Sequence, residues 1–197
     1  MLSRVAPSAL FVAACLLVTN AGAAFSKAPA PPKAAPGGSH QRAALAGCLN
    51  EWLFNGIWRV KVTSVGPIKT PPDTAGNFNS GWGVTVQFRN GTNVDLVPST
   101  TGMGHLTLVA ADGDTMDIGL TTSGTMDAQK LGYHDFPPSA QYTHQLTFLY
   151  PYGTAAADIK KPVKFLITFD ASIRNASSGP HYSTSSPSMR IDLTCKK

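Results

Sequence analysis

From residue 48 onward, apolar and polar residues alternate along the chain in seven short runs. In the first run, Trp58, Val60 and Val62 alternate with polar residues. The apolar positions of the other six runs are Trp82, Val84, Val86 and Phe88; Leu106 and Leu108; Met116, Ile118 and Leu120; Leu146, Phe148 and Tyr150; Phe165, Ile167 and Phe169; and Met189, Ile191 and Leu193. A period of two is typical of antiparallel strands that place one face on a core and the other in water. The pattern therefore predicts seven strands, and residues 94–97 are a candidate for an eighth.

The residues between these runs are typical of turns and loops. Asp112 and Gly113 lie between two runs and predict a hairpin, because Asp-Gly pairs favour positive φ. Asn90-Gly91-Thr92 predicts a turn. Seven or eight alternating strands separated by such turns are what a two-sheet sandwich requires. We therefore predict an all-β fold, an immunoglobulin-like antiparallel β-sandwich of about seven or eight strands.

The composition supports a single β domain and argues against a helical bundle. The chain has 197 residues, of which 43% are hydrophobic and 14% charged, and this is enough apolar material for a core. Thr, Val, Gly and Asp are common, while Glu51 is the only glutamate among the 11 acidic residues. Glutamate is a strong helix former, and such residues are scarce in this chain, so a helical bundle is nearly excluded.

The first 24 residues have the parts of a secretory signal peptide. Arg4 gives a basic start, residues 5–18 are apolar, and Ala21-Gly22-Ala23 supplies the small residues of a cleavage site. The apolar stretch is shorter than the roughly 20 residues that cross a membrane. Cys15 lies in a lipobox-like sequence, but apolar residues follow it, so we place it in the part that cleavage removes. The sequence predicts a secreted protein, extracellular or periplasmic, with no transmembrane segment after signal cleavage.

Residues 25–47 predict a flexible tether, because they are rich in Pro, Ala and Gly and have no apolar periodicity. The sandwich is then expected to occupy residues 48–197.

Removal of the signal peptide lowers the net charge of +5 by one, and so mild a charge does not predict a nucleic-acid partner. Lys160, Lys161 and Lys164 form a local basic cluster, which we interpret as a solvated loop and strand start.

Two cysteines remain after cleavage, Cys48 and Cys195, and they lie at the two ends of the patterned region. In an oxidising compartment these cysteines predict a disulfide, because neither has another partner. The bond would close a loop of 148 residues and join the first strand region to the last. Metal binding by two cysteines alone is disfavoured, because a structural zinc site needs four ligands.

Three segments carry a resemblance to a known family. They are residues 58–65 (WRVKVTSV), 83–92 (GVTVQFRNGT) and 106–114 (LTLVAADGD). In this order they resemble the secreted immunoglobulin-like domains of bacterial cell-surface lipoproteins and of the mycobacterial immunoprotective antigen type. The resemblance covers roughly residues 57–120 and implies an immunoglobulin-like fold in an extracellular setting. It implies no activity, and residues 121–141 do not follow the family pattern.

The sequence holds none of the common catalytic motifs. It has no H-E-x-x-H, no G-x-S-x-G and no phosphate-binding glycine loop. Since Glu51 is the only glutamate and the aspartates lie mostly in turns, no pair of carboxylates suggests a glycosidase. We therefore expect a protein that is not an enzyme and that has no catalytic residues, metal or cofactor.

One group of residues matches a metal-binding arrangement. Ten residues separate His105 from Met116 across the predicted hairpin, and Met103 lies two residues before His105. Secreted copper carriers with a cupredoxin-like sandwich use a similar spacing, because imidazole and thioether together select Cu(I). The sequence lacks the His-x-Met pair that such carriers also use. A periplasmic copper-binding carrier is therefore the alternative function, and the competing interpretation places Met116 in the core.

Calcium is a weaker metal hypothesis, based on Asp112, Asp114 and Asp117 near the predicted hairpin. Oxygen ligands at a turn bind Ca²⁺, but these aspartates lack the bidentate glutamate and the spacing of a known calcium loop. Asp117 would also point to the polar face of its strand, away from the turn. The sequence therefore favours a solvated hairpin over a calcium site.

The function that the sequence favours is binding or structural. We expect a secreted non-enzymatic module of the cell surface or extracellular space, whose contacts are made by loops at the ends of the sandwich. Its partner would be an extracellular or cell-envelope protein or surface ligand. Tyr150, Tyr152 and Trp82 are candidates for an aromatic platform, because exposed rings often mark recognition sites.

Overall fold

The computed structural model describes residues 44–70, 79–172 and 179–197. The predicted signal peptide and the tether as far as residue 43 lie outside the described residues. Strand β1 begins at Leu45, so the last three residues that the sequence assigned to the tether belong to a strand.

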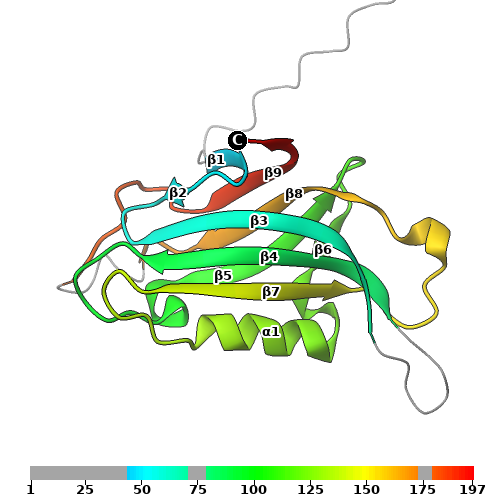
Figure 1. Ribbon diagram of the computed structural model, residues 1–197, viewed down its shortest axis with the longest axis horizontal. Helices are drawn as coiled ribbons and strands as arrows, with labels where there is room; N and C mark the ends of the chain where they lie inside the picture. Colours follow the sequence, from blue (N-terminus) through cyan, green and yellow to red (C-terminus); the bar gives the residue numbers. More distant parts are fainter. Residues whose placement is uncertain (1–43, 71–78, 173–178) are drawn as a thin grey trace, which may run out of the picture. The chain divides into compact units, whose positions relative to one another are not determined.

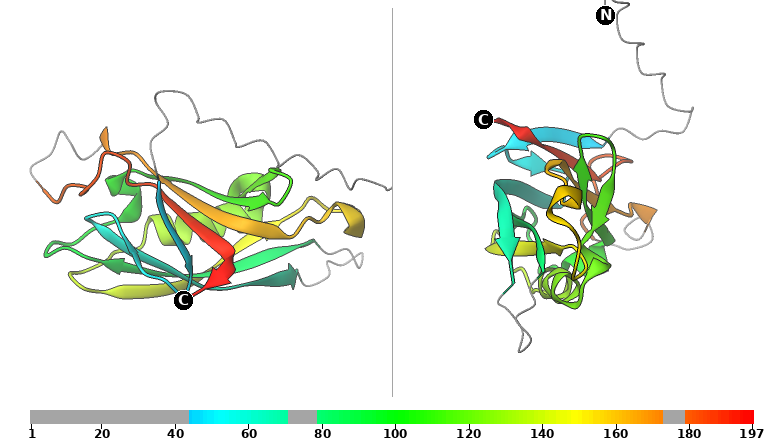
Figure 2. Two further views of the ribbon diagram at one scale, coloured as in Figure 1. Left: turned by 90° about the horizontal axis from the view of Figure 1, so that it is seen from above. Right: turned by 90° about the vertical axis from the view of Figure 1, so that its right-hand side faces the viewer.

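Within the described residues, nine strands form two sheets that face each other, and Figures 1 and 2 show the sheets as separate layers. The five-stranded sheet contains, in spatial order, β1 (Leu45–Leu49), β9 (Met189–Lys196), β8 (Pro162–Phe169), β5 (Met103–Ala110) and β6 (Thr115–Asp117). The four-stranded sheet contains β2 (Leu53–Phe54), β3 (Trp58–Lys69), β4 (Ser80–Asn90) and β7 (Gln141–Leu149). The predicted all-β sandwich is confirmed. Its strands pair antiparallel with one exception, the parallel pair β1 and β9.

The alternation predicts the strands β3 to β9 because their apolar positions fill the space between the sheets. The buried residues of the four-stranded sheet include Val60, Val62, Val84, Val86, Phe88, Leu146 and Phe148. Those of the five-stranded sheet include Leu106, Leu108, Met116, Phe165, Ile167, Met189 and Ile191. Trp58 lies fully buried at one end of this core, and its indole Nε1 donates a 2.8 Å hydrogen bond to Thr101 Oγ1. Its ring packs edge to face on Phe136 at 5.1 Å between centroids.

Two predicted strands differ from the structure. Residues 94–97 do not form a strand: Leu96 makes a single bridge to Phe136, and a 3₁₀ helix, η1 (Pro98–Thr101), follows. Proline at the start of η1 has no N–H for a strand ladder. Strand β6 ends at Asp117, whose carboxylate accepts a hydrogen bond from Gly119 N and starts the 3₁₀ helix η2 (Ile118–Leu120). Leu120 is therefore 53% exposed instead of facing the core.

A helix, α1 (Thr122–Gly132), lies where the sequence shows no strand pattern. It connects the five-stranded sheet to the four-stranded sheet, and it runs alongside the edge strand β7 (Figure 1). Thr121 caps it by accepting a hydrogen bond from Gly124 N. A shorter 3₁₀ helix, η3 (Ala156–Asp158), precedes β8. No helix in the described part of the chain is long and apolar enough to cross a membrane.

Candidate functional site

The outer face of the four-stranded sheet is basic where β3 and β4 pair. Arg59 and Lys61 on β3 and Arg89 on β4 alternate with buried core residues, so their side chains point away from the core. Arg59 lies directly opposite Arg89, and Lys61 lies directly opposite Gln87. Like charges directly opposite each other across two strands are normally unfavourable. We call these three cations, with the two aromatic residues described next, the basic face.

Two aromatic side chains complete the basic face at the edge of the sheet. Phe54 on β2 pairs with Arg59, whose guanidinium carbon lies 4.3 Å from the centre of the phenyl ring. Trp52 precedes β2, and the Lys61 ammonium lies 4.8 Å from the centre of its ring. Phe54 is 38% exposed, and Trp52 is 37% exposed. These cation–π contacts hold Arg59 and Lys61 toward the β2 edge and restrict their rotamers.

The turn after β4 positions Phe54. Asn90 is buried, and its amide nitrogen donates hydrogen bonds to the carbonyl oxygens of Val94 (2.7 Å) and Phe136 (2.8 Å). Its amide oxygen accepts from the backbone N–H of Thr92 at 2.9 Å. The next residue is Gly91, and a Cβ there would lie 2.6 Å from an edge carbon of the Phe54 ring. Glycine thus leaves the space in which the ring lies.

In the described part of the chain, no carboxylate forms an ion pair with Arg59, Lys61 or Arg89. Neutral hydrogen-bonding groups continue the face across the sheet: Gln141 lies opposite Arg89, and Thr143 lies opposite Gln87. The two cross-strand rows of the face therefore carry cations, amides and a hydroxyl, and no described acidic residue lies in either row.

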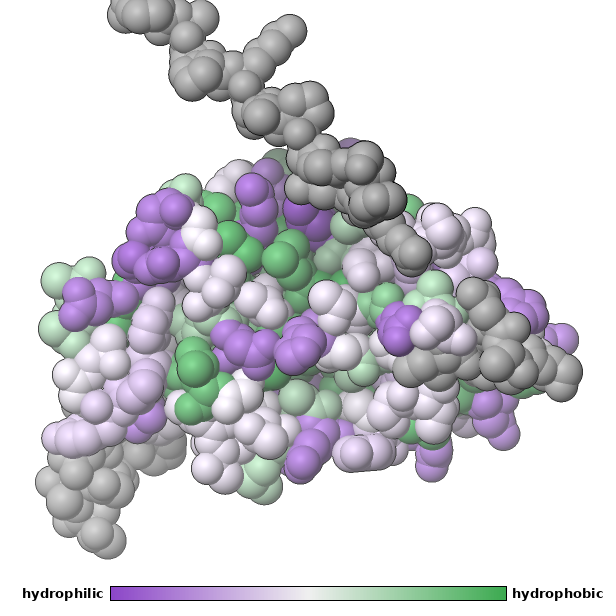
Figure 3. Space-filling view, turned by 180° about the vertical axis from the view of Figure 1, so that it is seen from behind, coloured by the Kyte–Doolittle hydropathy of each residue, from purple (hydrophilic) through white to green (hydrophobic). Residues whose placement is uncertain are grey.

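The outer face of the five-stranded sheet differs in charge. There Lys164 on β8 lies directly opposite Asp192 on β9, so a cation faces an anion across these two strands. The Asp192 pKa is lowered, chiefly by the Thr194 hydroxyl that donates to it. Figure 3 shows this side of the molecule, where hydrophilic and hydrophobic residues are mixed. The pairing of Lys164 with Asp192 thus contrasts with the like-charge pairing of Arg59 with Arg89 on the four-stranded sheet.

The structure does not bring the three candidate copper ligands together. Met116 is buried opposite Leu108, in the core as the competing interpretation expected. The His105 side chain is 80% exposed and lies on the other face of the hairpin, where its Nδ1 is 3.2 Å from Asp117 Oδ2. Met103 and His105 both line a groove of about 250 Å³ beside α1. No group of three or more His, Cys, Asp or Glu side chains in the described regions is arranged to hold a metal.

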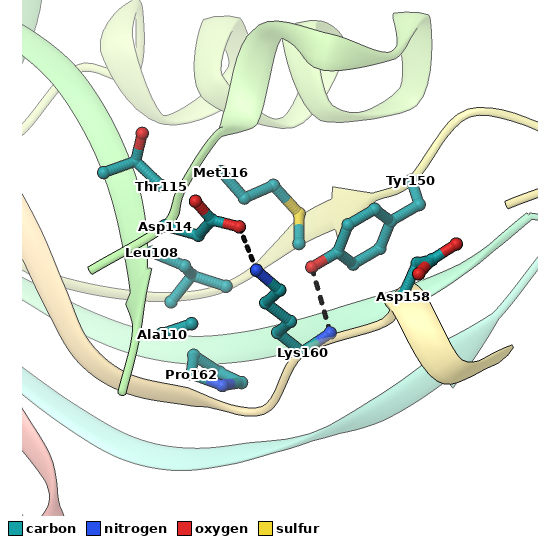
Figure 4. Close-up of a pocket in the computed structure, with 9 residues that line it drawn as sticks. All are labelled: Leu108, Ala110, Asp114, Thr115, Met116, Tyr150, Asp158, Lys160 and Pro162. Atoms are coloured by element: carbon teal, nitrogen blue, oxygen red, sulfur yellow. Dashed lines mark hydrogen bonds and ion pairs between the residues drawn. The ribbon is translucent and has the colours of Figure 1, made fainter. Parts of the chain in front are cut away.

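The two aspartates of the hairpin turn form ion pairs with a lysine of the same chain. The Lys160 ammonium contacts the Asp112 carboxylate at 2.7 Å and also contacts the Asp114 carboxylate. Figure 4 shows the contact with Asp114. These contacts lower the pKa of Asp112 and raise the pKa of Lys160. Asp117 is engaged elsewhere, with His105 and with the backbone of η2. The ammonium thus lies where the calcium hypothesis would put the metal.

The predicted aromatic platform is not assembled. Tyr150 lines a small cavity of about 80 Å³ with Met116 and Leu108, and its hydroxyl accepts a hydrogen bond from the backbone N–H of Lys160 (Figure 4). Tyr152, two residues later, is 63% exposed. The Trp82 ring is partly buried against the core, and its Nε1 has no hydrogen-bond partner among the described residues. Of these three residues, only Tyr152 is exposed, while Tyr150 and Trp82 are partly buried against the core.

The disulfide predicted between Cys48 and Cys195 is present. It joins β1 to β9, the first and last strands of the fold. Glu51 adds a second link near it, because its carboxylate accepts hydrogen bonds from Cys48 N at 3.0 Å and from Lys197 Nζ at 2.7 Å. These bonds, with Lys197 first, lower the pKa of Glu51.

No protein-family model and no curated protein matches this sequence. Two solved structures are similar in fold. The yjhA protein from Bacillus subtilis is 11% identical, with a TM-score of 0.45, over 75% of this chain and 99% of that one. An uncharacterised β-sandwich protein from Clostridium difficile 630 is 6% identical, with a TM-score of 0.41, over 83% of this chain and 99% of that one. Neither similarity identifies a family or an activity for this chain.

Proposed function

We propose that this protein is a secreted, non-enzymatic binding module that recognises an acidic partner through the basic face. The observation that carries the proposal is the juxtaposition of Arg59, Lys61 and Arg89 with no carboxylate paired to any of them in the described structure. A sheet that served only to fold would gain from an opposite charge at one of these positions, as Lys164 and Asp192 illustrate on the other sheet. An external anion supplies the missing charge.

The extracellular setting has two independent supports. The signal-peptide pattern of residues 1–24 comes from the sequence. The Cys48–Cys195 disulfide comes from the structure, and such bonds persist mainly in oxidising compartments. A relationship with the immunoglobulin-like domains of bacterial surface proteins agrees with both and remains a prediction of the sequence.

The copper-carrier alternative has weaker support than the binding module. It needs His105, Met103 and Met116 at one point, but Met116 faces the core and His105 faces solvent. Two ligands beside α1 remain, and Cu(I) sites of this type use thioether and imidazole ligands in larger numbers. In the proposed binding module, a sheet face contacts the partner, whereas the sequence predicted contacts by the loops at the ends of the sandwich.

The proposal is tested by binding of the mature protein to poly-L-glutamate, measured by biolayer interferometry at low and high salt. We expect measurable binding that weakens with salt, because exposed charges are screened. The double variant R59Q/R89Q is expected to lose at least tenfold in affinity. The matched control K164Q/R190Q removes the same charge from the other sheet and should bind like the wild type. Equal loss in both double variants would show a net-charge effect. The proposal would be overturned if the wild type bound neither this polymer nor any other acidic polymer.

A further inference from the structure

Resting on the proposed function, we infer that the acidic partner is a polysaccharide that carries uronate groups, bound across the strands of the basic face. The argument uses the chemistry of the side chains, their spacing and the absence of an apolar centre. Taken together, these three properties favour an acidic polysaccharide over an acidic protein or a nucleic acid.

The side chains of the face provide both kinds of contact that an acidic sugar needs. A guanidinium binds a carboxylate with two parallel hydrogen bonds, and Arg59 and Arg89 place two guanidinium groups on neighbouring strands. Amide and hydroxyl side chains donate to and accept from sugar hydroxyls, and Gln87, Gln141 and Thr143 supply them beside the cations. A ligand with carboxylates alone would leave these neutral groups unused.

The spacing of the face suits an extended sugar chain. Phe54, Arg59, Arg89 and Gln141 form one row that crosses all four strands. Lys61, Gln87 and Thr143 form the adjacent row. Neighbouring strands lie about 4.8 Å apart, so on β3, β4 and β7 each row presents one polar side chain at each step of that length. This step is comparable with the length of one pyranose residue in an extended polysaccharide.

The charge of the face is sparse and its apolar content is low. Three cations spread over two rows match a polymer with one carboxylate per sugar better than a nucleic acid, which carries a charge about every 1.7 Å in duplex form. The aromatic rings of Trp52 and Phe54 lie at the β2 edge and already contact Lys61 and Arg59. Protein interfaces have an apolar centre, and the middle of this face has none, since Arg89 and Gln87 occupy it.

The rings of Phe54 and Trp52 contribute to binding through the cations that they contact and need not stack on the sugar. By holding Arg59 and Lys61 against the sheet, they reduce the rotamer freedom that binding must otherwise remove. Phe54→Leu is therefore expected to weaken binding about two- to fivefold without any change in net charge. G91A, which places a methyl group against the Phe54 ring, is expected to act in the same direction.

The experiment compares four probes on the full mature protein: polygalacturonate, its fully methyl-esterified form, poly-L-glutamate and single-stranded DNA. We expect polygalacturonate to bind at least tenfold more tightly than polyglutamate of equal carboxylate content, and the methyl ester not to bind. Q87A/Q141A should weaken polygalacturonate binding about five- to tenfold and leave polyglutamate binding unchanged. R59Q/R89Q should abolish both, while K164Q/R190Q should abolish neither. Thermal unfolding of each variant shows that it is folded.

The outcomes separate this inference from the proposed function. Equal binding of polyglutamate and polygalacturonate, or no effect of Q87A/Q141A on either, would overturn the polysaccharide and leave the acidic-partner proposal standing. Preference for DNA would overturn the polysaccharide in favour of a nucleic acid. If none of the four probes binds, both proposals fail.

Discussion

At the scale of single residues, a substitution in the pair Arg59 and Arg89 should weaken binding without lowering the stability of the fold. The two guanidinium groups lie directly opposite each other on β3 and β4, and a like-charge pair of this kind costs about 0.2–1 kcal/mol. We expect R89Q to leave the free energy of unfolding unchanged or to raise it by that amount at low salt, while affinity for an acidic polymer falls. Urea unfolding and interferometry on the same preparation measure both quantities. If R89Q lowered both stability and binding, Arg89 would be a structural residue.

A second residue-scale prediction concerns His144, which lies beneath α1. Its side chain is only 12% exposed, its Nε2 is 3.2 Å from the Asp127 backbone oxygen, and its ring stacks on Tyr142. Burial lowers the pKa of His144 below the ordinary 6.5, although the nearby Asp127 carboxylate acts in the opposite direction. Lys130 and His134 also face this site and lower the pKa further.

The sign of the pH dependence follows from that shift. Because the folded pKa of His144 is depressed, the unfolded chain binds more protons between the folded pKa and 6.5. The stabilising effect of neutral His144 is therefore complete above pH 6.5 and is lost as the pH falls toward the folded pKa. The contribution has a limiting slope of about 1.4 kcal/mol per pH unit. Urea unfolding from pH 7.5 to pH 5 should show stability that falls with pH by no more than this slope, and H144Q should reduce the dependence. An unchanged slope in H144Q would assign the effect to another group.

At the scale of elements, α1 depends on the absence of a Cβ at one of its glycines. Gly124 lies in its first turn, and a Cβ there would be 2.0 Å from the Ile118 carbonyl oxygen and 2.7 Å from that of Thr147 on β7. Alanine normally stabilises a helix relative to glycine by up to about 1 kcal/mol. In G124A we expect the opposite sign, a loss of about 1–3 kcal/mol, because backbone atoms must move.

Gly132, the last residue of the same helix, supplies the control for G124A. Its added Cβ would meet only the Met103 methyl carbon, at 3.5 Å, which is an ordinary contact. G132A should therefore be neutral or stabilise by up to about 1 kcal/mol. Denaturant unfolding of the two variants tests the prediction. If G124A were as stable as G132A, α1 would not be packed against β7 as closely as described.

Much of the sandwich could be predicted from the sequence because a strand with one buried face requires alternation. Thus Val60 and Val62, or Phe165 and Ile167, identify β3 and β8 directly. Strand β2 escaped prediction because it has only two residues, and β1 because a parallel pairing at a sheet edge leaves its residues only partly buried. Helix α1 escaped because its 11 residues contain three poor helix formers in the first turn, so its formation depends on tertiary contacts.

The basic face was accessible to sequence reasoning only in part. Arg59, Lys61 and Arg89 occupy polar positions of two strands that the alternation predicts. Their convergence depends on the register of β3 against β4, which includes a bulge after Val62 and which alternation does not specify. Trp52 and Phe54 lie outside every alternating run, so their contacts with the cations could be found only in three dimensions.

At the scale of the whole molecule, the Cys48–Cys195 disulfide limits the freedom of the unfolded chain. It encloses 148 residues, and the chain-entropy model gives about 4–5 kcal/mol for a loop of that length. This is a large share of the roughly 5–15 kcal/mol that stabilises an ordinary domain. We therefore expect C48A/C195A to remain folded at 25 °C with a much lower urea midpoint.

The position of the bond determines what its loss would do to binding. Strand β1 is held in its sheet by parallel pairing with β9 and by the contact of Glu51 with Lys197, whereas the basic face lies on the other sheet. At urea concentrations where C48A/C195A is still folded, its affinity for polygalacturonate should equal that of the wild type. Wild-type protein unfolded in reductant should reproduce the variant's midpoint. If the variant lost binding while its core stayed folded, β1 and β2 would unfold together and carry Trp52 and Phe54 with them, so the disulfide would support the binding face as well as the fold.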